Sequence, residues 1–490
     1  MNVLMVASEC VPFIKTGGLA DVVGALPLAL RAHGWDARVL LPNYPAVART
    51  AADPRVVHRF DDLFGGEARV LASRAANGLE ILALDAPHLY DRPGNPYLGP
   101  DGRDWPDNHR RFAALSFAAA RLADLAPDGR SIDLLHAHDW QAGLTPLYLS
   151  RAARVPTVFT IHNIAFPGVF PADTAAGLGL PPALFQPAGY EYYGQVSFLK
   201  AGLVFSDLLT TVSPTYAQEL QGPAFGMGFD GVLRHRREDF FGILNGIDTA
   251  IWNPEKDPLI ARAYSARSLA GKRADRAALQ DAMGLDPDPD AFLACVVSRL
   301  TDQKGLDLLL GALPDLMAAG GQLALLGTGD PALEIAFAAA AVQHRGRVGA
   351  RIGYDEPLSH ALIAGADAIL VPSRFEPCGL TQFYGLRYGT IPIVARTGGL
   401  ADSIIDANQA ASEAGAATGV VFDPIDLDGL RGGLRRALAL FANKPVWSRM
   451  VQTALKHPVG WERSAERYDG LYRAALAGRA SYPAPPRARS

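Results

Sequence analysis

Short runs of apolar residues, many of them β-branched, alternate along this chain with longer stretches rich in alanine and leucine. In the first half the short runs are Val3–Ala7, Ala37–Leu41, Leu134–Ala137 and Thr157–Ile161. The second half repeats the pattern with Phe292–Ser298, Gln322–Leu326 and Ala368–Val371. Continuous apolar runs of this length are typical of strands buried on both faces, and the stretches between them favour helices. The alternation predicts an α/β protein with two doubly wound parallel sheets.

The length of the chain also indicates two domains. A chain of 490 residues exceeds the size at which a single hydrophobic core stops growing. Turn-forming residues within Gly242–Pro254 mark the crossing between the halves. We therefore expect an N-terminal domain at 1–242 and a C-terminal domain at 243–459. The proline-rich residues 480–490 predict an extended, flexible tail to which no function is assigned.

Composition and charge argue against several classes of protein. The formal net charge of −4 comes from nearly balanced acids and bases, which disfavours a general binder of nucleic acid or anionic membranes. Residues Met1–Ala7 carry no basic segment and no apolar stretch of about 20 residues follows, so neither a signal peptide nor a membrane-spanning helix is expected. The cysteines Cys10, Cys295 and Cys378 are scattered, which favours a reducing, cytoplasmic location over a disulfide framework or a cysteine-rich zinc site.

A strand, a glycine loop and a helix follow one another near the N-terminus. The first apolar run ends at Ser8 and Glu9, and the segment from Lys15 to Asp21, which reads KTGGLAD, precedes helical spacing. Paired glycines allow a ligand to approach the backbone, the helix N-terminus offers N–H groups, and Lys15 adds positive charge for a phosphate. The segment matches neither the Walker pattern nor the dinucleotide fingerprint, so a tight turn with a surface lysine is an equal alternative.

A second glycine pair and two charged segments occur in the second half. Gly399 belongs to a glycine pair that follows the apolar run Ile391–Ala395. This pair, like the first, is either a ligand-binding loop or a tight turn. Arg299 and Lys304 follow Ser298, at the edge where open α/β sheets bind ligands. Two cations there can hold a leaving diphosphate in place of a metal, although such a pair is more often a solvated loop feature.

The segment around Glu376 places a carboxylate close to a predicted helix N-terminus. There it can order the hydroxyls of a donor sugar and stabilise an oxocarbenium-like centre. A simple favourable interaction with the helix dipole explains the position equally well.

Histidine, aspartate and tryptophan occur at the ends of two successive strands of the first half. The segment from His136 to Trp140 reads HAHDW, and His162 follows the run Thr157–Ile161. Three histidines and an aspartate can bind a metal, but the spacing matches no zinc motif. Sugar binding by Asp139, His162 and the ring of Trp140 is the favoured interpretation, and buried structural histidines are the remaining one.

Taken together, these segments resemble the bacterial glycogen synthase and plant starch synthase family. The resemblance runs from Val3 to about Tyr468 and rests on KTGGLADV, HAHDW, NGID, SRL, QKG and EPCGL in this order. It implies a GT-B fold with two Rossmann-like domains facing a central cleft, an N-terminal acceptor side and a C-terminal nucleotide-sugar side. Helices at about 460–478 are implied to pack back on the N-terminal domain.

The activity that the resemblance implies is a glucosyl transfer that needs neither metal nor cofactor. Glucose would move with retention from ADP-glucose to the non-reducing 4-hydroxyl of an α-1,4-glucan such as glycogen, with release of ADP. The implied catalytic set is Glu376, Arg299, Lys304, His162 and Asp139. The implied substrate-binding residues are Lys15, Gly18, Asp21, Asn245, Glu9, Trp140, Cys378, Gly379, Leu380, Thr381 and Gly399.

The residues leave the mechanism and the donor open. The wider group of retaining transferases carries a second glutamate eight residues after the first, where this chain has Tyr384, so the contacts to adenine and ribose stay unassigned. With no obvious second carboxylate beside Glu376, we expect a same-face substitution, and a covalent glycosyl-enzyme is the alternative. The rival functions are a UDP-glucose-dependent synthase, a nucleotide-sugar epimerase, a glucan phosphorylase and an inactive glucan-binding scaffold. Oligomeric state is not predicted.

Overall fold

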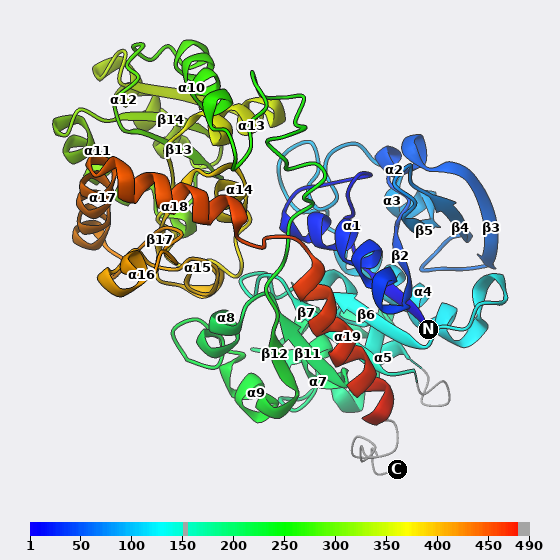
Figure 1. The fold of residues 1–490 in the computed structure, drawn as a ribbon. Helices are drawn as coiled ribbons and strands as arrows, with labels where there is room; N and C mark the ends of the chain where they lie inside the picture. Colours follow the sequence, from blue (N-terminus) through cyan, green and yellow to red (C-terminus); the bar gives the residue numbers. More distant parts are fainter. Residues whose placement is uncertain (150–154, 479–490) are drawn as a thin grey trace. The chain divides into compact units, whose positions relative to one another are not determined.

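The structure, a computed structural model, describes residues 1–149 and 155–478. Contacts between residues divide the chain into two units. The first comprises Met1–Asn245 and the chain from Trp461, and the second comprises Gly246–Gly460. In each unit helices pack around one large sheet (Figure 1).

The large sheet of the first unit has nine strands within the described residues. In spatial order they are β12 (Phe240–Gly242), β11 (Leu208–Thr211), β7 (Thr157–Ile161), β6 (Leu134–His138), β1 (Asn2–Val6), β2 (Asp36–Pro42), β5 (Glu80–Asp85), β4 (Ala68–Arg74) and β3 (Ala52–Phe60). The run from β12 to β5 is parallel, as the sequence pattern predicts. The strands β3 and β4 depart from that prediction because they pair antiparallel at one edge. Their connections are too short for the crossover that parallel pairing needs.

Helices and a small second sheet complete the first unit. The helices are α1 (Gly18–Leu30), α2 (Pro45–Thr50), α3 (Pro87–Tyr90), α4 (Asn108–Leu125), α5 (Thr145–Tyr148), α6 (Thr174–Gly177), α7 (Phe198–Phe205), α8 (Pro214–Glu219), α9 (Asp230–His235) and α19 (Glu462–Ala477). Short 3-10 turns are η1 (Arg31–His33), η2 (Pro127–Gly129), η3 (Trp140–Ala142), η4 (Pro182–Leu184) and η5 (Arg237–Asp239). The small sheet consists of β8 (Val169–Phe170), β10 (Gln195–Ser197) and β9 (Glu191–Tyr192).

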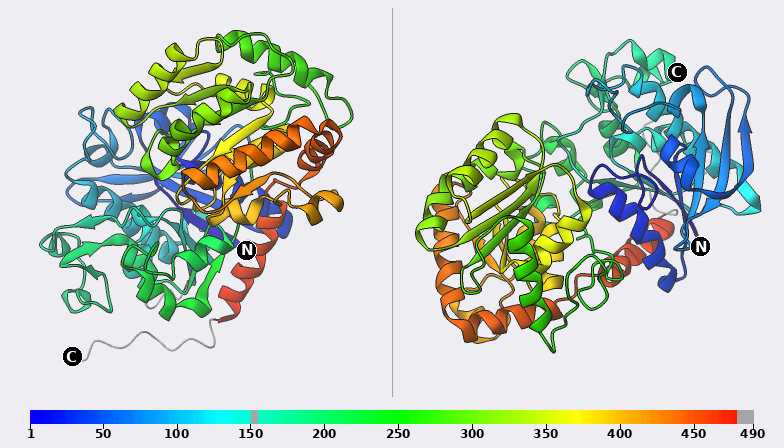
Figure 2. Two further views of the ribbon diagram at one scale, coloured as in Figure 1. Left: turned by 90° about the vertical axis from the view of Figure 1, so that its left-hand side faces the viewer. Right: turned by 90° about the horizontal axis from the view of Figure 1, so that it is seen from above.

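The last described helix, α19, belongs to the first unit although the second unit precedes it in sequence. It lies beside α1, as the red and blue helices show in the views of Figure 2. The indole of Trp35 donates to Asp469 at 2.7 Å, and the hydroxyl of Tyr472 lies 2.7 Å from Nδ1 of His136. Tyr468 and Tyr472 are fully buried, so the first unit's core is complete only when α19 is in place.

The second unit contains a six-stranded parallel sheet within the described residues. In spatial order its strands are β15 (Val348–Ile352), β14 (Gln322–Gly327), β13 (Leu293–Val297), β16 (Ala368–Val371), β17 (Ile391–Ala395) and β18 (Val420–Phe422). This is the 3-2-1-4-5-6 order of a doubly wound nucleotide-binding fold, which confirms the predicted fold class.

Two groups of helices cover the second sheet. The helices are α10 (Ala270–Ala282), α11 (Leu306–Ala318), α12 (Pro331–Gln343), α13 (Glu356–Gly365), α14 (Thr381–Tyr388), α15 (Gly398–Ser403), α16 (Gln409–Glu413), α17 (Leu427–Ala442) and α18 (Lys444–Lys456), with the 3-10 turn η6 (Asp302–Lys304). One group packs α11 against α12 and α17, and the other packs α13 against α10 and α14. Among the described residues, no helix combines the length and the apolar character that a membrane crossing requires.

Both sheets reverse their strand order at one point. In the first unit the reversal lies between β1 and β6, and in the second it lies between β13 and β16. Open α/β sheets bind ligands outside the carboxyl ends of the strands at this point, because the loops diverge there and leave a crevice. The topology therefore indicates where a site can form in each unit.

Candidate active site

Residues singled out from the sequence lie at both reversal points. Glu9 follows β1 and Asp139 follows β6, whereas Arg299 follows β13 and Glu376 follows β16. We call Glu9, the loop Lys15–Asp21, Asp139 and His162 the first half-site. The second half-site comprises Arg299, Lys304 and Glu376.

Glu9 holds the glycine loop Lys15–Asp21 through hydrogen bonds. One carboxylate oxygen accepts hydrogen bonds from the N–H groups of Thr16 and of Gly17, the latter at 3.3 Å. The other accepts from the hydroxyls of Thr16, at 2.6 Å, and Tyr97. Glu9 is only 3% exposed. With four donors on its two oxygens, the carboxylate is positioned to fix the loop, and its substrate-binding role stays a prediction.

The held loop presents the N-terminus of α1. Gly18 begins the helix, and the N-cap Gly17 supplies no side-chain hydrogen bond, so N–H groups of the first turn remain available for an anion. Lys15 lies at the same end, where its Nζ pairs with Oδ1 of Asp21 at 2.9 Å. Both side chains are partly exposed, and such surface pairs contribute about 1 kcal/mol or less, so a bound phosphate can compete for Lys15.

Asp139 fixes the backbone that follows β7. Its Oδ1 accepts from the N–H of His162 at 2.7 Å and from that of Asn163 at 3.4 Å. The φ of Asp139 is 55°, in a region that costs energy for a residue other than glycine, so neighbouring contacts hold the residue in place. Burial raises the pKa of its carboxyl to about 7, despite the opposing effect of the two N–H donors. Strained backbone and a pKa near neutrality are features that concentrate at functional sites.

The three histidines of this region are buried and hydrogen bonded to one another or to hydroxyls. Nδ1 of His138 lies 3.0 Å from Nε2 of His162, and Nε2 of His136 lies 2.6 Å from Oγ1 of Thr160. Burial lowers the pKa of His136 and of His162 to about 3, so the rings are neutral. In residues 1–149 and 155–478, no group of three or more His, Cys, Asp or Glu side chains is arranged to hold a metal ion.

Trp140 and Asn245 occupy different environments. The indole of Trp140 packs against Phe112, with ring centroids 4.9 Å apart, and against Phe170 and Phe198. Its ring therefore packs mainly against other aromatic side chains, as in a hydrophobic core. Asn245 is 7% exposed, and its buried Oδ1 accepts no hydrogen bond from the described part of the chain. That oxygen is a buried acceptor whose donor is not among these residues.

The second half-site is built on an ion pair between Lys304 and Glu376. Nζ of Lys304 lies 2.5 Å from Oε2 of Glu376, and their side chains are 17% and 6% exposed. The hydroxyl of Ser373 donates to the same carboxylate oxygen at 2.9 Å. A short, nearly buried pair of this kind fixes both side chains, and it places one cation and one anion at the sheet's reversal point.

Further contacts join the loops after β13 and β16. Gln303 donates its side-chain amide to the carbonyl of Phe375 at 3.2 Å, and the N–H of Arg374 donates to the carbonyl of Gln303 at 2.9 Å. The exposed side chain of Arg299 makes no ion pair or hydrogen bond to the residues that the structure describes. Arg299 can therefore turn toward an anion bound beside Lys304.

The glycine pair of α15 lies against the Glu376 loop. A side chain at Gly398 would meet the carbonyl oxygen of Glu376 at 2.0 Å, and one at Gly399 would meet that of Cys378 at 2.2 Å. The N–H of Gly399 donates to the Glu376 carbonyl at 3.0 Å. Close packing of two loops thus explains the glycines, and it brings the N-terminus of α15 next to Glu376.

The start of α14 completes the second half-site. Gly379 has a φ of 73°, and the side-chain amide of Gln382 donates to the carbonyls of Cys378 and Gly379 at 2.9 and 3.1 Å. The N-cap Leu380 provides no side-chain hydrogen bond to the first turn, which begins at Thr381. N–H groups at a helix N-terminus that no side chain caps can bind oxygen atoms of a ligand.

The sequence did not indicate which hydroxyls bond to Glu376 and Glu9, and it did not single out Tyr354. Ser373 bonds to Glu376 and Tyr97 bonds to Glu9, and neither partnership has a sequence signal because it depends on how the loops fold. Tyr354 follows β15 at the carboxyl edge of the second sheet and is 78% exposed. An aromatic ring just beyond an apolar run was the available signal for Tyr354.

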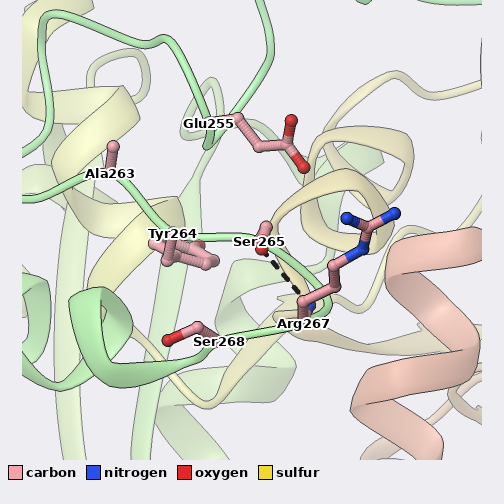
Figure 3. Close-up of a pocket in the computed structure, with 6 residues that line it drawn as sticks. All are labelled: Glu255, Ala263, Tyr264, Ser265, Arg267 and Ser268. Carbon is pink, nitrogen blue, oxygen red and sulfur yellow. Dashed lines mark hydrogen bonds between the residues drawn. The ribbon is translucent and has the colours of Figure 1, made fainter.

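A surface cavity of about 560 Å³ lies elsewhere in the second unit (Figure 3). Its lining residues are Glu255, Ala263, Tyr264, Ser265, Arg267 and Ser268. In Figure 3 the side chains of Glu255 and Arg267 flank it, and the N–H of Arg267 donates to the Ser265 hydroxyl at 3.2 Å. No residue expected to bind substrate lines this cavity.

Known proteins match nearly the whole chain. Residues 2–235 match the family described as starch synthase catalytic domain, and residues 283–445 match glycosyl transferases group 1. Glycogen synthase of Roseobacter denitrificans is 56% identical over 98% of this chain and 100% of its own length. Glycogen synthase of Paracoccus denitrificans is 57% identical over 97% of this chain and 100% of its own length.

A solved structure agrees with these relatives. The catalytic domain of starch synthase IV from Arabidopsis thaliana, bound to ADP and acarbose, superposes with a TM-score of 0.88 at 32% identity. The match covers 97% of this chain and 99% of the plant domain. The chain therefore belongs to the glycogen synthase and starch synthase family of glycosyltransferases, with the GT-B fold of two Rossmann-like domains.

Proposed function

We propose that this glycosyltransferase extends an α-1,4-glucan such as glycogen by retaining transfer of glucose from ADP-glucose to the non-reducing 4-hydroxyl, with release of ADP. The observation that carries the proposal is the 2.5 Å pair of Lys304 and Glu376 at the reversal point of the second sheet. The lysine cation can stabilise the negative diphosphate, and the carboxylate can stabilise the glucosyl group that is transferred from it.

Lys304 and Arg299 are proposed to stabilise the departing ADP. When the bond between the anomeric carbon and the phosphate oxygen breaks, negative charge grows on the diphosphate. Lys304 is already held in place, whereas the exposed Arg299 can move onto the phosphate. Preorganised cations of this kind contribute several kcal/mol to a transition state, which is the role that a metal ion has in other transferases.

Glu376 is proposed to act on the glucosyl group as positive charge develops at its anomeric carbon. In a same-face substitution the bond to phosphate breaks, the bond to the acceptor oxygen forms, and the acceptor's proton passes to the departing phosphate oxygen. The contacts of Glu376 with Lys304 and Ser373 support an electrostatic role, because both partners lower the nucleophilicity of the carboxylate. A covalent glycosyl-enzyme on Glu376 is the alternative, and a trapped adduct found by mass spectrometry would establish it.

The first half-site is proposed to bind substrate oxygens. Lys15 and the N–H groups of Gly18 and its neighbours suit phosphate, and release of Lys15 from Asp21 accompanies binding. The Oδ1 of Asn245, which accepts no hydrogen bond from the described residues, suits a sugar hydroxyl, as does His162. Trp140 is assigned to shaping this region, because its ring packs against Phe112.

The donor's base is assigned to Tyr354. Its ring is 78% exposed at the same sheet edge as Arg299 and can stack on a purine. Stacking favours the larger adenine over uracil, which supports ADP-glucose over UDP-glucose. The thiols of Cys10, Cys295 and Cys378 are buried and form no disulfide among the described residues, which is consistent with a reducing cytoplasm.

The test measures incorporation of label into glycogen. Purified protein is incubated with glycogen and radiolabelled ADP-glucose or UDP-glucose in EDTA, and label is counted in the precipitated polymer. Strong incorporation from ADP-glucose that resists EDTA supports the donor, the transfer and the independence from metal together. No incorporation from either donor would refute the proposal and favour an inactive glucan-binding scaffold.

A further inference from the structure

Two buried imidazoles, one of them in the first half-site, share one hydrogen bond. His138 is the last residue of β6, and His162 follows the last residue of the neighbouring strand β7. Nδ1 of His138 and Nε2 of His162 are 3.0 Å apart, and the ring centroids are 5.2 Å apart. Their exposed fractions are 0% and 9%. The parallel register of the two strands therefore fixes the contact.

One proton occupies this contact. Burial lowers the pKa of both imidazoles far below neutrality, to about 3 for His162. Each ring is thus neutral and carries one N–H. Either His138 donates from Nδ1 and His162 carries its own proton on Nδ1, or His162 donates from Nε2 and His138 carries its proton on Nε2.

The surroundings of His138 distinguish the two arrangements. Its Nε2 is buried and has no hydrogen-bond partner among residues 1–149 and 155–478. In the second arrangement that atom would be a buried N–H without an acceptor, which is rare in folded proteins. In the first arrangement Nε2 of His138 carries no proton and is only a lone pair without a donor. The ring of His136, with its centroid 4.0 Å from that of His138, further limits access of water.

From this geometry we propose that His138 is a positioning residue that fixes the tautomer of His162, so that His162 carries its proton on Nδ1. His162 then offers a hydrogen-bond donor, and not an acceptor, to the substrate. Nδ1 of His162 makes no hydrogen bond within the described part of the chain, so it can reach a sugar hydroxyl or a phosphate oxygen as acceptor. The inference rests on the proposed function for its consequence, although the tautomer itself can be observed without any activity.

The assignment of the proton can be tested directly by NMR. Wild-type protein labelled with ¹⁵N-histidine is examined through long-range correlations between ring nitrogens and ring protons, which distinguish Nδ1–H from Nε2–H. The signals of His162 are identified by their loss in His162→Gln. We expect His162 to carry its proton on Nδ1. A proton on Nε2 of His162 in the wild type would overturn the proposal, whatever the activity of the protein.

A pair of matched variants then tests whether His138 is the cause. In His138→Phe the donor is lost, so the tautomer of His162 should shift toward Nε2–H, the form that an unconstrained imidazole prefers. The same change at the stacked neighbour, His136→Phe, disturbs packing on the same strand but should leave His162 on Nδ1–H. An unchanged His162 tautomer in His138→Phe would overturn the proposal.

The kinetic consequence separates positioning from simple damage to the fold. His138→Phe should lower kcat for glucosyl transfer about tenfold, with unchanged KM for glycogen, because one aligned donor is lost from the transition state. A rise in the KM for glycogen with unchanged kcat would overturn that consequence. If the wild type shows Nδ1–H on His162 but incorporates no glucose, the proposed function fails while the assigned tautomer stands. If neither phenylalanine variant folds, the wild-type spectrum still decides the assignment.

Discussion

Replacement of Lys304 by alanine should separate the two consequences of its pairing with Glu376. At 2.5 Å, unit charges attract each other by about 7 kcal/mol at an effective dielectric constant of 20, before desolvation is subtracted. Loss of one partner from a buried pair typically costs about 3–5 kcal/mol, because the other charge is left uncompensated. Ser373 still donates to Glu376 and Lys304 is 17% exposed, so we expect the lower end of that range, about 3 kcal/mol.

The activity of Lys304→Ala should fall more severely than its stability. The lost charge would otherwise stabilise a diphosphate whose negative charge increases in the transition state, so kcat should decrease about 100-fold or more. The measurements are initial rates with ADP-glucose and glycogen, and urea unfolding of the same preparations. The double variant Lys304→Ala/Glu376→Gln should regain much of the stability, since the buried charge is gone, and should remain inactive.

A matched control is available on the same loops. Arg374 pairs with Asp307 in two bonds of 2.8 and 2.7 Å but is 33% exposed. Arg374→Ala should therefore cost about 1 kcal/mol or less and leave kcat within a few-fold. Unchanged turnover in Lys304→Ala, or equal losses in the two alanine variants, would refute the reasoning about Lys304.

Three further predictions concern other residues. Glu9→Gln should raise the KM for the nucleotide-sugar donor about tenfold with a smaller effect on kcat, because a neutral amide holds the N–H groups of Thr16 and Gly17 less firmly. Donor saturation curves measure this KM, and an unchanged value would contradict the role of Glu9 in holding the loop. Burial raises the pKa of Asp139 from 3.8 to about 7, so the folded protein binds a proton at this carboxyl more tightly than the unfolded protein does. The resulting contribution to the free energy of unfolding is fully present below about pH 4 and is lost as the pH rises through 7, by up to about 4 kcal/mol. Asp139→Asn should accordingly gain stability over the wild type at pH 8 and much less at pH 5 in urea titrations; a difference that does not depend on pH contradicts the shifted pKa. Burial also raises the pKa of the Cys295 thiol to about 12, so a maleimide should label it only after unfolding, and rapid labelling of the native protein would disagree with the burial.

The sequence pattern predicted several of the strands that are buried on both faces. Thr157–Ile161 is β7 with the same bounds, and Ala368–Val371 is β16. The antiparallel strands β3 and β4 were not predicted, since β3 is largely exposed and its residues form no apolar run. A pattern of apolar positions reports burial, and an exposed edge strand lacks that signal.

The motifs name residues that the fold brings to the reversal points, but they do not indicate the partners of those residues. Glu9 and Glu376 were both singled out, yet the contact of Glu9 with Tyr97 joins residues 88 positions apart, and that of Lys304 with Glu376 joins residues 72 apart. Such pairings follow from strand order, which places the loops after β13 and β16 side by side. Spacing along a chain carries no direct information about contacts between distant loops.

The return of α19 to the first unit has a consequence for biosynthesis. On a translating ribosome the second unit is complete once Gly460 has emerged, whereas the first still lacks the helix that carries Tyr468 and Tyr472. Until then the indole N–H of Trp35 lacks its acceptor Asp469, and Nδ1 of His136 lacks the hydroxyl of Tyr472. The part of the protein that is synthesised first is therefore the last to finish folding, and the nascent chain exposes the apolar surface that α19 later covers.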